Sequence, residues 1–348
     1  MLKRLFGELR WGVLPVPGRL MAVIFFIFLF AFPLINDAKY PLHLLSVTAV
    51  FAIFAVSWDM LSGYTGQVNF GHALFFGMGA YGSALLYQHL GWQPWITIPL
   101  GALVGALAGI VTCLPALRLR PPYLSLLTMA FPLIMAKVLE SLPRAWAGGK
   151  YGMQKLPHLP GGPQGEYFIV LLVMAAAVFI MWKLTDAGSK YVRTGLLFHA
   201  IREDEIAARA AGINTIRYKI LAFAIGGFFA GIAGALHAHI FGAAGPGLFS
   251  LLMSFQVIIW VVFGGIVSIY GAVVGVYTLR PLVEYLRDTS IYDYRFLIMT
   301  GVVVLILLFM PEGVAVWVRD KIERRCPRCK LTNVAWRREC RACSASLR

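Results

Sequence analysis

Long apolar runs, each free of Asp, Glu, Lys and Arg, dominate the pattern of hydrophobic and polar positions along the chain. They are Leu20–Ile35, Pro41–Trp58, Ala73–Leu117, Pro121–Ala136, Tyr167–Trp182, Ile220–Leu279 and Phe296–Pro311. A helix needs about 20 residues to cross the hydrocarbon of a bilayer, so residues 73–117 hold two crossings and residues 220–279 about three. The pattern predicts an all-α polytopic membrane protein with about ten transmembrane helices.

Composition and charge agree with this class. Hydrophobic residues make up 59% of the chain and charged residues 14%, against about 25% charged residues in a soluble domain. Most of the 31 Lys and Arg residues, against 16 Asp and Glu, gather before residue 20, at 118–120, at 190–219 and after residue 311. The positive-inside rule places these groups in the cytoplasm and residues 143–163 and 280–295 outside. We therefore expect a multi-pass protein of the plasma (inner) membrane, surrounded by lipid, with both termini cytoplasmic and no nucleic-acid partner.

One segment between two apolar runs mixes polar groups with glycine. Residues 57–81 contain Asp59, Gln67, Asn69 and His72 together with several glycines. Irregular backbone at membrane depth occurs where it is buried in protein or lines a cavity. Polar groups at such a break are therefore candidates for the translocation path. An ordinary interfacial loop is the alternative.

A charge-dense stretch at residues 186–216 is the longest polar interruption of the apolar pattern. Its centre predicts an amphipathic helix over residues 196–211, with Ile201, Ala208 and Ala211 as an apolar stripe and Gly212 as the residue that ends it. Such an element suits docking on another protein, although a solvated surface helix is the alternative. The docking candidates are Ile201, Arg202, Glu203, Asp204, Glu205, Arg209 and Gly212, of which Arg202, Glu205 and Arg209 have i+3 and i+4 spacings.

Several blocks, taken in order, resemble the permeases of branched-chain amino acid ABC importers, and the chain is most similar to their longer, M-type subunit. The blocks are Leu61–Tyr81, Arg118–Phe131, Gly148–Gly152, Ala200–Gly212 with Tyr218 and Lys219, and Met310–Gly313. The resemblance implies a second permease subunit, ATP-binding subunits that contact loop 186–216, and an external solute-binding protein. The family usually has Asn where this chain has Asp59, so Asp59→Asn is expected to be tolerated.

The resemblance implies a permease subunit that moves branched-chain or other hydrophobic amino acids and is driven by a separate ATPase. The chain has no G-x-x-x-x-G-K-[ST] motif, so we expect it to bind no nucleotide itself. It has no H-E-x-x-H or G-x-S-x-G motif either, and we do not expect an enzyme. A permease for urea or short amides is the alternative. An ion-coupled carrier is disfavoured because residues 220–279 contain no charged residue.

The last thirty residues carry a different pattern. Cys326 and Cys329 form one C-x-x-C pair, and Cys340 and Cys343 form a second, ten residues later. Two such pairs supply the four thiolates of a structural zinc site, although the separation is shorter than in most zinc ribbons. We expect a transmembrane permease domain at residues 1–318 and a cytoplasmic zinc-ribbon-like tail at 319–348, with one structural zinc ion bound by the four cysteines. Free or redox-active thiols are the alternative.

Overall fold

The computed structural model describes residues 17–36, 38–117, 119, 121–186, 193–287, 294–329, 332–335, 339–340, 343 and 346. Arg118, Arg120 and residues 187–192 of the predicted docking loop lie outside this part of the chain. Six helices in the described part are long and apolar enough to cross a membrane, or seven if one bent pair counts as a single span. The all-α membrane class is confirmed, whereas the expected count of about ten is not.

The first half of the chain builds five long helices beside an N-terminal one. Its elements are α2 (Pro17–Ile35), α3 (Lys39–Trp58), the π-helical turn η2 (Asp59–Gly63), α4 (Ala73–Leu90), α5 (Pro94–Ala116), α6 (Pro121–Ser141), α7 (Arg144–Ala147), the 3-10 turn η3 (Gly149–Tyr151), β1 (Met153–Gln154) and α8 (Gly162–Thr185). The run 73–117 thus forms two antiparallel helices, α4 and α5, as its length predicted.

The second half begins with two short helices and ends in a small hairpin. Its elements are α9 (Thr194–Glu203), α10 (Glu205–Ala210), α11 (Thr215–Phe241), β2 (Ala243–Ala244), the 3-10 turn η4 (Pro246–Phe249), α12 (Leu251–Gly264), α13 (Ile269–Arg287), α14 (Arg295–Phe309), α15 (Val314–Ile322), β3 (Glu323–Arg325) and β4 (Thr332–Val334). Strand β1 pairs with β2 and β3 pairs with β4, both antiparallel. The run 220–279 therefore supplies three helices.

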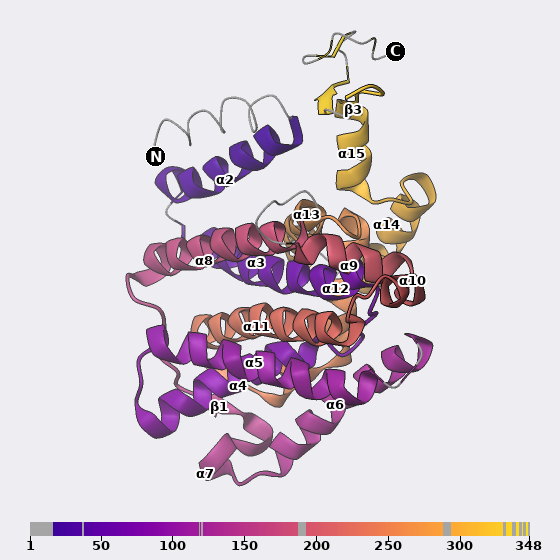
Figure 1. Cartoon of the computed structure of the whole chain (residues 1–348). Helices are drawn as coiled ribbons and strands as arrows, with labels where there is room; N and C mark the ends of the chain where they lie inside the picture. The colour runs from indigo at the N-terminus through magenta and orange to yellow at the C-terminus, as the bar shows by residue number, and fades with distance from the viewer. Residues whose placement is uncertain are drawn as a thin grey trace, which may run out of the picture.

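Glycine permits the close contact among α4, α5 and α11, which pack side by side in the centre of the bundle (Figure 1). A Cβ added at Gly227 would lie 2.4 Å from the Gly105 carbonyl oxygen, and one at Gly79 would lie 2.3 Å from the Gly231 backbone. Neither position has room for a side chain. Bare backbone on facing helices is the usual way in which membrane helices approach closely.

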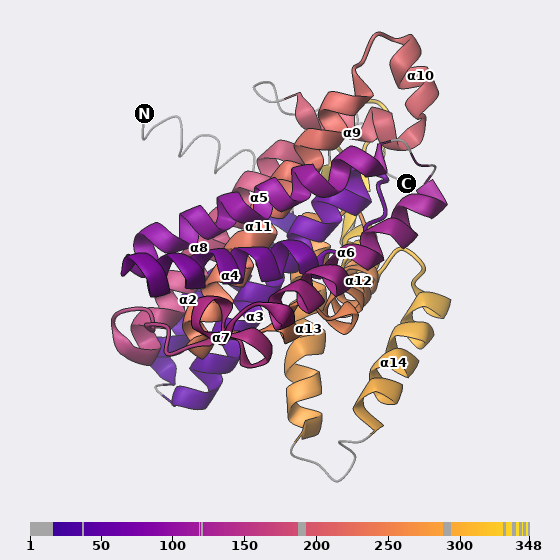
Figure 2. The same cartoon turned by 90° about the horizontal axis from the view of Figure 1, so that it is seen from below.

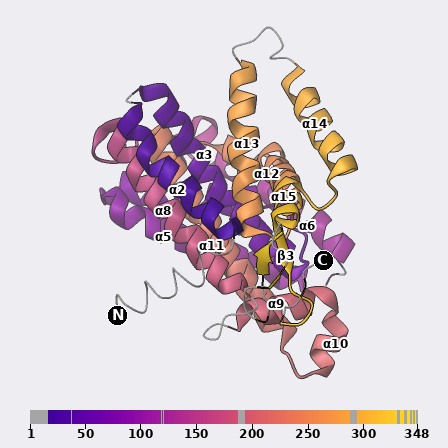
Figure 3. The same ribbon diagram turned by 90° about the horizontal axis from the view of Figure 1, so that it is seen from above.

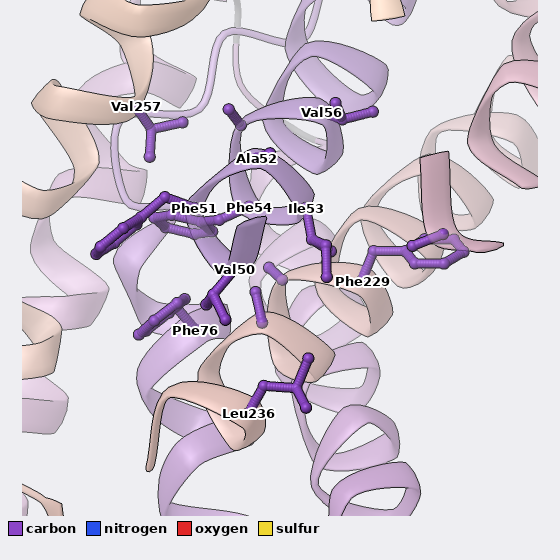
Figure 4. Packing of buried hydrophobic residues seen from close by; sticks show 14 of the residues in the cluster. Val50, Phe51, Ala52, Ile53, Phe54, Val56, Phe76, Phe229, Leu236 and Val257 are labelled. Atoms are coloured by element: carbon purple, nitrogen blue, oxygen red, sulfur yellow. The ribbon is translucent and has the colours of Figure 1, made fainter. Parts of the chain in front are cut away.

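Helix α3 is the most enclosed helix of the bundle and packs against α8, α11, α12 and α13. Phe51 and Phe54 are almost completely buried, and both rings lie against Phe76 of α4, with centroids 6.1 and 4.7 Å away. Figure 4 shows these rings between α3 and its neighbours, with Val257 on one side and Leu236 on another. The core of the bundle therefore surrounds α3, and Ser46, Thr48 and Ser57 on this helix are buried in protein.

The two ends of the bundle differ. Helices α9 and α10 lie at one end, and the last turn of α13 and the first turn of α14 lie at the other (Figures 2 and 3). The C-terminal hairpin lies at the same end as α9 and α10. Between α12 and α13 the chain bends by 112°, and Val267 in this break has a φ of 63°, which is unusual for a β-branched residue.

Candidate functional site

The polar segment 59–72 connects α3 to α4 without regular helix over residues 66–72, and protein side chains satisfy its backbone. The Trp58 indole N–H donates to the Asn69 carbonyl oxygen at 2.7 Å, and the Asn69 N–H donates to Ser62 Oγ at 3.2 Å. The Phe70 N–H donates to Thr128 Oγ1 at 3.1 Å. Irregular backbone is thus buried against α3 and α6, which is the condition under which membrane proteins accept it.

His72 and Asn69 meet in this segment, and Gln67 does not join them. His72 is fully buried, its Nε2 lies 2.9 Å from Ser57 Oγ, and its Nδ1 lies 3.4 Å from the Asn69 amide nitrogen. The Ser57 hydroxyl donates to the Phe54 carbonyl oxygen, so the network is consistent with a neutral ring protonated at Nε2. Gln67 is only half-buried. Two of the four predicted path residues therefore form one hydrogen-bonded group.

Asp59 occupies a different position, at the break between α12 and α13. Its carboxylate is fully buried, Oδ1 accepts the Val267 N–H at 2.8 Å, and Oδ2 accepts the Ser268 N–H at 3.0 Å. These N–H groups lie just before α13 begins at Ile269, where a negative charge interacts favourably with the helix dipole. Asp59 therefore holds the start of α13 and the strained Val267 backbone to the end of α3.

The predicted docking helix is two helices joined at Asp204. The Asp204 side chain accepts the N–H groups of Ile206 and Ala207, at 2.8 and 3.0 Å, and so caps α10 in the manner of an N-cap aspartate. Gly212 follows α10 with a φ of 83°, the left-handed conformation expected at the end of a helix. The single helix over 196–211 was wrong because the Asp204 cap starts a new helical axis.

This break changes which residues face inward. Ile201 and Ala208 are buried, but Ala211 is exposed and does not belong to the apolar stripe. Arg202 and Glu203 are also exposed, and Ile206 is 80% exposed. The exposed surface at this end of the bundle therefore combines one large apolar side chain with charged ones.

Glu205 joins α10 to the membrane helix α11. Its Oε2 lies 2.7 Å from Lys219 Nζ, its Oε1 accepts from Arg209, and the Thr215 hydroxyl donates to the same Oε1 at 3.2 Å. Partial burial raises the pKa of Glu205, but hydrogen bonds from Lys219 and Arg209 outweigh it and hold the pKa below its ordinary value. Glu205 and Arg209 are paired as their spacing predicted, whereas Lys219 and Thr215 were not foreseen as partners.

Helix α9 touches the polar segment directly. The His199 and Tyr64 rings lie 5.3 Å apart, and Arg202 packs on Gly66, where an added Cβ would lie 3.4 Å from Arg202 Cγ. Phe198 is fully buried and lies near the Tyr218 ring of α11. A shift of α9 would therefore move Tyr64 and Gly66, which follow η2 and precede Asn69 and His72.

The four C-terminal cysteines converge at the hairpin of β3 and β4. Their Sγ atoms all lie within 4.8 Å of one another, with 3.5 Å between Cys326 and Cys343 and 3.4 Å between Cys329 and Cys340. Bonds of about 2.3 Å from zinc to sulfur in a tetrahedron separate the sulfurs by about 3.8 Å, so the cluster has the size of such a site. The Cys329 N–H lowers the pKa of Cys326. The cluster could hold a metal ion.

Comparison with known proteins identifies the family to which the chain belongs. A family profile described as the permease component of branched-chain amino acid transport systems matches residues 40–310. The chain belongs to this permease family. It is therefore a multi-pass membrane component of a transport system, and the core bundle, the polar segment and helices α9 and α10 all lie within the matched residues.

Individual relatives agree. The chain is 28% identical to LivM, the high-affinity branched-chain amino acid transport permease of Salmonella typhimurium, over 82% of its own length and 72% of the relative. It is 28% identical to LivM of Escherichia coli over 80% and 70% of the two chains, and 25% identical to BraD of Pseudomonas aeruginosa over 78% and 92%. No solved structure matches the chain. The predicted family resemblance is thus confirmed.

Proposed function

We propose that this chain is the M-type permease subunit of an ABC importer, and that it moves branched-chain or other hydrophobic amino acids across the plasma (inner) membrane. Family membership over residues 40–310 supports the transport class. The names of LivM and BraD refer to branched-chain amino acids, and this supports the solute class. The other subunits of the importer are a second permease, ATP-binding subunits and an external solute-binding protein.

The observation that carries the mechanism is the double attachment of helices α9 and α10. Through Glu205 and Lys219 they connect to α11, and through His199 and Tyr64 they connect to the polar segment. An ATPase that binds the exposed surface of α9 and α10 would displace α11 and segment 64–72 together. Ile201, Arg202, Glu203, Asp204, Glu205, Arg209 and Gly212 build this docking site, in which the exposed charges contact the ATPase and the buried groups transmit the movement.

The polar segment is the element that receives this movement. We place Asp59, Gln67, Asn69 and His72 beside the translocation path, since three of them are buried and Gln67 is half-buried. Asp59 extends the connection to the break between α12 and α13, because its carboxylate binds both backbone N–H groups there. Displacing η2 would therefore change the 112° bend of that pair. The path would open and close by this bend.

The orientation follows from the docking site. If α9 and α10 meet a cytoplasmic ATPase, then the C-terminal hairpin at the same end is cytoplasmic too (Figure 3). A structural zinc ion held by Cys326, Cys329, Cys340 and Cys343 would fold this tail, whose described residues include a two-stranded sheet and the cysteine cluster. The boundary proposed at residue 318 lies within α15, so the tail would follow the last membrane-associated helix directly.

Uptake by the complete importer tests the function. Vesicles that contain both permeases and the ATPases, supplied with the solute-binding protein, should accumulate labelled leucine only when ATP is inside. Labelled urea is the comparison, because a urea or short-amide permease is the second candidate. Accumulation of urea without leucine would replace the proposed solute, and leucine uptake that persists without the ATPases would favour an ion-coupled carrier.

A further inference from the structure

A charged pair lies inside the membrane bundle at the end opposite to α9 and α10. Arg280 and Glu284 are four residues apart on α13, which places them on one face of the helix, and both are half-buried. The Arg280 guanidinium lies 5.1 Å from the centre of the Phe51 ring, and the Tyr40 hydroxyl donates to Glu284 Oε1 at 3.3 Å. Ionisable side chains on a membrane helix are rare and mark functional sites more often than other residues.

Two buried polar atoms beside this pair have no hydrogen-bond partner among the described residues. They are Trp260 Nε1 and His237 Nδ1. Trp260 is 2% exposed, and its ring lies 5.2 Å from that of Phe51; the His237 ring lies 6.1 Å from the same ring. Buried donors and acceptors are nearly always paired, so two unpaired atoms around one ring indicate a place where a polar molecule binds.

The cluster reaches the surface at the outer end of the bundle. Tyr40 is 57% exposed and His43 is also exposed, and both begin α3. The His43 ring lies 5.4 Å from Phe241, the last residue of α11, and Phe241 stacks on His237 at 4.3 Å. Since α11 begins next to α10, its last turn lies a full helix length from the docking surface. Tyr40 and His43 thus lie exposed at the end of the bundle away from the proposed ATPase.

We propose that Phe51, His237, Trp260, Arg280 and Glu284 form a recognition site for a zwitterionic α-amino acid. This deepens the proposed function and rests on it. The solute carboxylate binds the Arg280 guanidinium, the solute ammonium binds the Glu284 carboxylate, and the apolar side chain lies against the Phe51 and Trp260 rings. Adjacent positive and negative groups match a zwitterion and bring no net charge into the bundle, and guanidinium binds carboxylate with paired hydrogen bonds. Urea offers neither charge.

The Trp260 and His237 nitrogens supply the remaining polar contacts. The indole N–H donates to the solute carboxylate, and His237 Nδ1, whose ring also lies near Phe51, binds a water molecule that accompanies the solute. Sequence patterns did not indicate this cluster, because Arg280 directly follows the charge-free run 220–279 and was assigned to an outer segment. The site becomes visible only because α13 continues to Arg287.

Two substitutions with matched controls test the site in the complete importer. Arg280→Gln removes the cation, and Trp260→Phe removes the indole N–H while keeping an aromatic ring. Their controls are Arg144→Gln, whose guanidinium lies 5.2 Å from the Tyr151 ring, and Trp95→Phe, which changes a 53% exposed tryptophan. We expect ATP-driven leucine uptake to fall about tenfold or more in Arg280→Gln and by a smaller factor in Trp260→Phe, since hydrogen bonds to a charged group are among the stronger ones. The controls should keep wild-type uptake.

A binding measurement separates recognition from a structural role. Leucine should raise the thermal unfolding midpoint of the purified permease and ATPase complex, whereas leucinamide, which lacks the carboxylate, and isocaproate, which lacks the ammonium, should not. Arg280→Gln should abolish the effect of leucine and leave the midpoint without ligand unchanged. Wild-type uptake in Arg280→Gln, or a fall in uptake that follows only a lower midpoint, would overturn the site. A wild-type importer that transports no amino acid would instead overturn the proposed function.

Discussion

Asp59 offers the sharpest test of the contact between α3 and the break between α12 and α13. Its carboxylate is fully buried, and both of its oxygens accept backbone N–H groups from that break. Asp59→Asn keeps one acceptor oxygen and turns an amide NH₂ toward the second N–H group. A hydrogen bond to a charged group contributes about 1.5–3 kcal/mol, and one such bond is lost. The neutral amide offsets part of this because burying it costs less than burying a carboxylate. We expect a net destabilisation of about 1–2 kcal/mol.

Asp59→Leu provides the second point of comparison. It removes both acceptors and leaves the Val267 and Ser268 N–H groups unpaired, so we expect a destabilisation of about 3–5 kcal/mol. The measurement is the thermal unfolding midpoint of the purified permease complex, together with leucine uptake in vesicles. The order should be wild type, then Asp59→Asn, then Asp59→Leu.

Because the family usually has Asn at this position, we expect the Asp59→Asn variant to fold and to transport. The loss of one hydrogen bond to the α12–α13 break means that it should do so with lower stability. An Asp59→Asn complex that unfolds at the wild-type temperature or above would refute the reasoning, because it would mean that a single acceptor suffices at the α12–α13 break. Equal uptake in the Asn and Leu variants would show that the break does not control the path.

The remaining predictions concern the docking loop, the metal centre and the helix contacts. Glu205→Lys should separate ATP hydrolysis from uptake at normal membrane levels, whereas the control Glu140→Lys, which breaks the ion pair with Lys137 on α6, should leave both unchanged. Because the pKa of Glu205 is held below its ordinary value, its stabilising ion pairs persist above that value and are lost only as pH falls through the lowered pKa. Coupling should therefore not change between about pH 6 and 8. The wild-type chain should carry about one zinc ion by metal analysis and Cys326→Ser much less, and a wild-type chain without zinc under reducing conditions would exclude the site. Gly234→Ala, whose Cβ would lie 1.9 Å from a backbone oxygen of α4, should lower the unfolding midpoint, whereas Gly301→Ala, with nothing within 4 Å, should not.

The amino-acid sequence by itself determined the class of this protein and the kind of each segment. Charge-free runs predicted membrane helices because burial in lipid requires apolar side chains over a length set by the bilayer. The C-x-x-C pairs predicted the cysteine cluster because two thiolates of each pair lie on one short turn and a brief connection can bring the two pairs together. The polar loop predicted a docking element, although the Asp204 cap divided it into two helices. All of these are local properties, readable from residues that lie near one another in the chain.

Only the tertiary structure decided which distant residues meet. Asp59 binds the backbone 208 and 209 residues away, Glu205 binds Lys219 on the following membrane helix, and Arg280 lies over Phe51. No periodicity predicts such pairs, because helix packing and the bend after α12 set them. Packing also limited the number of spans, since α12 has only 14 residues and reaches membrane length only together with α13. Hydrophobicity indicates which segments of the chain are removed from water. Contacts between helices determine where the chain turns and which charged residues come together.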